Sequence, residues 1–151
     1  MLAPDIVTYL ILVGVGTASN IFAGPINETI TTGIGILEKP GRAPDKIADL
    51  EFPEFDLIVR GVDKATSYNL AHDAYWHLHQ QTDLLIGSVL YKRIEALDSP
   101  YYYGKDNLNR FIYISSFTTI KEIEPDILAN LFICGPYYCG LWMLKSKAAI
   151  P

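Results

Sequence analysis

Cysteine is scarce in this sequence of 151 residues, which contains only Cys134 and Cys139. Neither a histidine nor a third cysteine lies beside them, so the pair supplies at most half of a zinc site. Gly135-Pro136 between them would allow a disulfide across a tight turn, whereas two reduced, partly buried thiols are the simpler interpretation. The cysteines therefore predict neither a metal-stabilised domain nor a disulfide-rich one.

Basic residues are also few. Lysine and arginine number 12 against 17 acidic residues, which gives a net charge of −5. Proteins that bind nucleic acid without sequence preference need clustered positive charge, so the composition argues against that class. An acidic wall repels phosphates, however, so a protein past which DNA moves without sticking stays compatible with this charge.

Long hydrophobic runs are missing. The apolar run 6–15 is about half the length that a bilayer requires, and no positive charge precedes it, so we expect neither a membrane span nor a secretory signal there. A second apolar stretch, 128–144, is interrupted by Asn130, Gly135, Pro136 and Gly140. We therefore expect no membrane partner.

Catalytic motifs are absent as well, since the chain has no P-loop, no G-x-G-x-x-G, no G-x-S-x-G and no HExxH. His72, His77 and His79 share one predicted helix but would need further ligands to hold a metal ion. Acidic residues between 45 and 56 fit a solvated surface better than a nuclease site. We predict no catalytic residue, cofactor or metal site and no enzymatic activity, with a small metal-dependent hydrolase or nuclease as a remote alternative.

Half of the residues are hydrophobic, which suits one packed domain. Alternating and helical periodicities predict helices over 5–12 and 64–80, a short extended segment over 20–25, and strands over 29–38, 55–61, 89–97 and 110–121. Pro, Gly and polar residues predict loops over 39–51 and 98–110. We expect an α+β domain over 1–124, with about four mostly antiparallel strands and two helices on one face, followed by a C-terminal apolar extension over 125–151.

The predicted strands carry apolar residues on both faces, including Ile58, Ile94, Ile112 and Ile114. Helices on one face cannot cover all of them, so the surplus indicates a protein interface. Tyr101, Tyr102 and Tyr103 in the second loop fit the same interpretation, because tyrosine is frequent at interface hot spots and base stacking would require more basic neighbours.

Several motifs in order resemble a family of tailed-bacteriophage minor capsid or tail terminator proteins. These motifs are Asp5-Ile6-Val7-x-Tyr9-Leu10, Gly14-Val15-Gly16, Gly41-Arg42-Ala43-Pro44-Asp45, Val59-Arg60-Gly61, Ser99-Pro100, Gly104-x-Asp106 and Asn109-Arg110. Each is weak alone, but together they span about residues 4–121, and nothing similar is found for the extension.

The resemblance implies a hexameric ring in the virion neck, assembled in the host cytoplasm. Such a ring caps the tail tube, stops its polymerisation and docks on the head-tail connector or stopper, with DNA passing through the lumen without specific binding. We expect the interface residues to be Arg42, Asp45, Tyr101, Tyr102, Tyr103, Lys105, Asp106, Arg110 and Trp142. Another neck component, such as a head-completion or stopper protein, and a stand-alone cellular binding module are the alternatives.

Overall fold

A computed structural model describes residues 1–123 of the chain. The elements are α1 (Leu2–Leu12), β1 (Ile21–Phe22), β2 (Gly33–Asp45), β3 (Leu50–Gly61), α2 (Lys64–Leu78), β4 (Gln81–Ile86), β5 (Val89–Ala96), β6 (Tyr101–Lys105) and β7 (Phe111–Glu122). Within the described part the strands form one seven-stranded sheet in the order β1-β2-β3-β7-β5-β4, and β6 also pairs with β7. β1 and β2 run parallel and the other pairs run antiparallel, so the sheet is mixed.

Both predicted helices are confirmed, because local signals fix their ends. α1 begins three residues before the predicted start and ends at Leu12, where Val13 is the C-cap and the following Gly14 has a φ of +84°. At α2 the Asp63 carboxylate accepts a 2.8 Å hydrogen bond from the Thr66 N–H. That backbone bond, joined by one from the Thr66 hydroxyl, lowers the pKa of Asp63.

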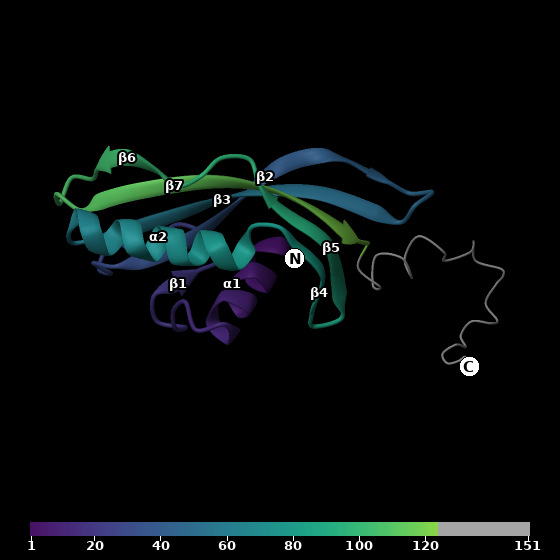
Figure 1. The fold of residues 1–151 in the computed structure, drawn as a ribbon, viewed down its shortest axis with the longest axis horizontal. Helices are drawn as coiled ribbons and strands as arrows, with labels where there is room; N and C mark the ends of the chain where they lie inside the picture. Colours follow the sequence, from purple (N-terminus) through teal and green to yellow (C-terminus); the bar gives the residue numbers. More distant parts are fainter. Residues whose placement is uncertain (124–151) are drawn as a thin grey trace, which may run out of the picture.

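The two helices pack on the same face of the sheet, as predicted (Figure 1). Phe55 and Phe117 lie on this face at opposed positions of β3 and β7, and their stacked rings are 5.0 Å apart. The Tyr91 hydroxyl on β5 donates to Asp5 of α1, and the Tyr9 hydroxyl of α1 donates to the carbonyl of His77 on α2. The core therefore lies between the sheet and both helices.

The expectation of about four strands is wrong, because β1, β4 and β6 add three strands to the four that were predicted, and β2 is longer than expected. β2 continues through residues 39–45 and makes a long hairpin with β3, so only 46–49 remain as a turn. β4 follows α2 directly, and β6 occupies the middle of the predicted loop 98–110. β5 and β6 pair with successive halves of β7.

The face of the sheet away from the helices is called the open face below. Ile58, Ile112 and Ile114 lie there and are half-buried, whereas Ile94 belongs to the core. Part of this face is covered by the segment that precedes β2, because a Cβ at Gly35 would lie 2.7 Å from the carbonyl oxygen of Gly24. The glycines of β2 thus allow another backbone to approach, as their spacing predicts.

Candidate functional site

Exposed aromatic side chains follow one another along β6, and one of them, Tyr102, lies beside the start of α2. Tyr101, Tyr102 and Tyr103 are all exposed, Tyr103 to 66%. The ring of Tyr102 lies 5.7 Å from that of Tyr113, and the ammonium of Lys64 lies 4.9 Å from the Tyr102 ring centre. A cation over an aromatic face is a favourable contact, so Tyr102 is held in place although it is solvent-accessible.

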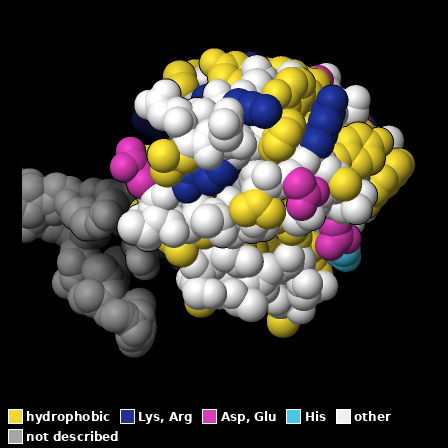
Figure 2. All heavy atoms as spheres, turned by 90° about the vertical axis from the view of Figure 1, so that its left-hand side faces the viewer, with side chains coloured by type: hydrophobic (Ala, Val, Ile, Leu, Met, Phe, Trp, Pro, Cys, Tyr) yellow, Lys and Arg dark blue, Asp and Glu magenta, His cyan; other side chains and the backbone are white. Residues whose placement is uncertain are grey.

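The first turns of α2 extend this surface. The exposed Tyr68 ring stands edge-on to Tyr113 at 5.9 Å, and the ammonium of Lys105 lies 4.7 Å from the Phe111 ring centre. We call this surface the aromatic end: Lys64, Tyr68, Tyr101, Tyr102, Tyr103, Lys105 and Leu108. Figure 2, which views that side of the molecule, shows hydrophobic side chains with basic and acidic ones among them. Large aromatic residues of this kind dominate protein-protein contacts.

A buried charged network lies near the turn between β6 and β7, on the open-face side of the sheet, where Arg60 is opposite Ile112. Asp106 accepts hydrogen bonds from Nε of Arg110 at 2.8 Å and from the Leu108 N–H at 2.9 Å. Nη1 of Arg110 donates to the Glu28 carbonyl at 2.7 Å, and Nη2 of Arg60 donates to the Ile30 carbonyl at 2.7 Å. The two guanidinium groups therefore fix segment 27–30 and the turn between β6 and β7.

The charges of this network shift its pKa values. Burial raises the pKa of Asp106, but hydrogen bonds from the backbone N–H groups of Arg110 and Leu108 and from the Arg110 guanidinium outweigh it, so the net shift is downward. Burial lowers the pKa of Arg60, and repulsion by Arg110 adds to that effect. Asp106 and Arg110, predicted as interface residues, thus lie in an internal network that positions β6. Arg60 was missed, although an arginine in an otherwise apolar strand end was a signal for it.

The turn between β2 and β3 forms a second exposed surface, the hairpin tip (residues 45–51). Oδ1 of Asp45 accepts hydrogen bonds from the N–H groups of Ile47 at 3.0 Å and Ala48 at 3.2 Å, and Asp49 has a φ of +56°. This geometry presents Ile47 with 98% of its surface exposed. Sequence reasoning missed Ile47, and its signal was a single isoleucine within a charged turn.

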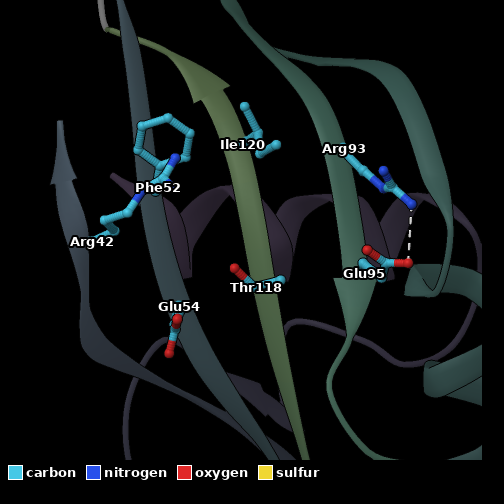
Figure 3. A pocket seen from close by; sticks show the side chains of 7 residues that line it. All are labelled: Arg42, Phe52, Glu54, Arg93, Glu95, Thr118 and Ile120. Carbon is cyan, nitrogen blue, oxygen red and sulfur yellow. Dashed lines mark hydrogen bonds and ion pairs between the residues drawn. The ribbon is translucent and has the colours of Figure 1, made fainter. Parts of the chain in front are cut away.

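The open face carries a depression of about 310 Å³ near the hairpin (Figure 3). Its lining residues are Arg42, Phe52, Glu54, Arg93, Glu95, Thr118 and Ile120. The Arg42 guanidinium lies 3.8 Å from the Phe52 ring centre, and Arg93 pairs with Glu95 at 3.0 Å. The four charged side chains of the lining come from three strands: Arg42 from β2, Glu54 from β3, and both Arg93 and Glu95 from β5. They carry charges of both signs, which suits contact with another protein surface better than binding of one small ion.

The acidic and histidine residues that could have formed a metal site are dispersed. Asp56 binds Lys39 at 2.9 Å, and Asp45 holds the hairpin turn. His77 pairs with Asp73, whereas Nδ1 of His79 accepts the Ala96 N–H. Within residues 1–123 no group of three potential ligands is arranged to hold a metal ion.

No helix within residues 1–123 is long and apolar enough to cross a membrane. Trp142, the two cysteines and the predicted extension 125–151 lie outside the described residues.

Comparison with known proteins identifies the family. The fold is similar to a chain from the solved structure titled "Virion of native gene transfer agent (GTA) particle", with a TM-score of 0.62 and 16% sequence identity over 80% of this chain and 94% of that chain. No curated protein matches the sequence. The sequence profile described as "Bacteriophage tail terminator protein" matches residues 9–123. The chain therefore belongs to the bacteriophage tail terminator family.

Proposed function

We propose that this structural protein of the phage virion forms a closed ring, a hexamer, at the head-tail junction. The ring caps the tail tube and stops its polymerisation, joins the tail to the connector or stopper, and lets DNA pass through its lumen. Assembly takes place in the host cytoplasm before the ring enters the virion.

The family match carries this proposal, because it spans nearly all described residues rather than one motif. The distribution of exposed side chains supports it. The aromatic end and the hairpin tip lie at opposite ends of the longest axis (Figure 1), so each subunit offers two different surfaces. A ring of identical subunits needs two such unlike surfaces, since its interface is heterologous and closes on itself.

The charge of the chain supports a lumen that DNA traverses. Six copies at −5 each amount to about −30 per ring. Such a ring repels phosphates as a whole, so DNA moves through it without being retained. Some basic side chains near the sheet are also occupied within the subunit, since the guanidinium groups of Arg60 and Arg110 donate hydrogen bonds to backbone carbonyl groups.

Native mass spectrometry and negative-stain imaging of the full-length protein test the ring. A hexamer would have a mass of about 101 kDa, six times the 16.9 kDa chain, and would appear as a ring as wide as the tail tube. A monomer at micromolar concentration would contradict the proposal. Pull-down on purified tail tubes and on purified portals then separates the two neck roles: a terminator binds the tubes, and binding to portals alone would assign a head-completion or stopper role.

A further inference from the structure

We propose that neighbouring subunits of the ring meet through the hairpin tip of one copy and the aromatic end of the next, with Ile47 as the central side chain. This inference rests on the proposed ring and names the two surfaces that build it. The contacting residues are exposed in the single chain, and the partner that covers them is a second copy of the same chain.

Ile47 is the first argument. This isoleucine, exposed to 98% at the end of a hairpin, is not part of the core that residues 1–123 form. The turn that carries it is ordered by the two hydrogen bonds to Asp45. A preformed turn loses little conformational entropy on binding, so the side chain is ready to insert into an apolar surface.

The aromatic end supplies such a surface. Tyr103 and Leu108 are each 66% exposed, and Tyr102 is supported from below by Tyr113 and Phe111. Burying an isoleucine among tyrosine rings removes apolar surface from water on both partners. Tyrosine also brings little entropic cost, because it has only two rotatable side-chain bonds.

The charges of the two surfaces are complementary. Residues 45–51 contain three acidic side chains and one lysine, a net charge of −2, and one of the acidic side chains, Glu51, pairs with Lys121 at 4.0 Å. The aromatic end carries two exposed lysines, Lys64 and Lys105, beside the aspartates Asp63 and Asp106, whereas Arg60 and Arg110 are buried close to Glu28. Both aspartates there are engaged, one by the cap of α2 and the other by the arginines, so Lys64 and Lys105 face the incoming acidic tip.

The shape of the molecule makes this contact intermolecular. The hairpin and β6 lie at opposite ends of the longest axis (Figure 1), so the two surfaces of one chain cannot meet. The outer half of β2 contains Pro40 and Pro44 and two register shifts, features that disfavour pairing with a further strand. The tip therefore docks through its side chains and not by strand addition.

Photo-crosslinking tests the contact directly. The photoreactive residue p-benzoylphenylalanine replaces Ile47 in the full-length protein, and in a control it replaces Leu12, which is also exposed but lies at the end of α1. We expect crosslinked dimers whose joined peptides contain residues 64–68 or 101–108, and no such peptides from the control. A ring whose crosslinks map elsewhere would overturn this inference alone, whereas a monomer would overturn the ring as well.

Two substitutions give the energetic test. Ile47→Ser should weaken subunit association by about tenfold to a hundredfold, the equivalent of one buried aliphatic side chain. Lys105→Glu should weaken it also, and adding Asp49→Lys should restore it, because the swapped charges attract again. Unaltered circular dichroism shows that each variant is folded, and association unchanged in both single variants would contradict the contact.

Discussion

Replacing Arg110 by methionine tests the buried network that positions the aromatic end. Arg110 is 7% exposed, and its guanidinium binds Asp106 and the carbonyl groups of Glu28 and Ile30. Methionine retains most of the apolar stem but removes all of these donors. The segment before β2 and the turn before β7 then lose their common anchor.

The magnitude follows from the bonds that are lost. Hydrogen bonds to a charged group contribute about 1.5–3 kcal/mol each, and breaking a buried ion pair costs about 3–5 kcal/mol. Asp106 keeps its backbone hydrogen bonds and has Nη1 of Arg60 at 3.9 Å, which limits the damage. We therefore expect Arg110→Met to lower the free energy of unfolding by about 2–4 kcal/mol.

Urea unfolding measures this loss, and hydrogen exchange locates it. Amides of residues 27–30 and 106–110 should show the largest acceleration in the variant, whereas amides of α1 should accelerate only as far as the loss of global stability requires. Arg93→Met is the matched control, because Arg93 forms an exposed pair with Glu95 that contributes less than about 1 kcal/mol. Equal stability losses in the two variants, or a loss below about 1 kcal/mol for Arg110→Met, would refute the reasoning.

Two further predictions concern acid stability and the core. The pKa of Asp106 is lower in the folded protein than its ordinary value of 3.8, so its contribution is present above that value and is lost as the pH falls through the folded-state pKa. Asp106→Asn should therefore be less stable than the parent at neutral pH and lose less on acidification, measured as urea midpoints between about pH 6 and pH 2; parallel curves would contradict this. Phe117→Ala opens a cavity beside Phe55 and should cost about 3–5 kcal/mol, whereas Tyr103→Ala should cost less than about 0.5 kcal/mol, and similar costs would contradict the assigned burial.

The helices and the long strands were predictable because their signals are local. Pro4 lies in the first turn of α1, Asp63 caps α2, and Phe55, Leu57 and Val59 alternate along β3 as a half-buried strand requires. The family was also predictable, since its motifs are spread in order over the part of the chain that the profile matches.

The outer half of β2 was not predictable from composition. Pro40, Gly41 and Pro44 are typical of a loop, yet here they lie on the outermost part of a hairpin, where no further described strand needs the missing proline N–H. A Cβ at Gly41 would lie 1.9 Å from the Phe52 carbonyl oxygen, so glycine is required by the close approach of β3. Tertiary pairing thus overrides the local preference.

β4 and the site residues were missed for other reasons. β4 is short, its polar residues precede its apolar ones, and Asp83 within it has a φ of +52°, so no alternation marks it. The turn Gly87-Ser88 between β4 and β5 was the available signal of a hairpin. Ile47 and Arg60 were overlooked because exposure and burial of single residues depend on the neighbouring strands, which local sequence does not encode.

The length of the phage tail tests the central claim most directly. Electron microscopy of lysates compares phage lacking this protein with the same phage supplied with it from a plasmid. The proposed terminator predicts tails of variable and excessive length, separate from filled heads, and uniform joined tails when the protein is supplied. Tails of normal, uniform length in its absence would contradict the account, because the tube would then be stopped by something else.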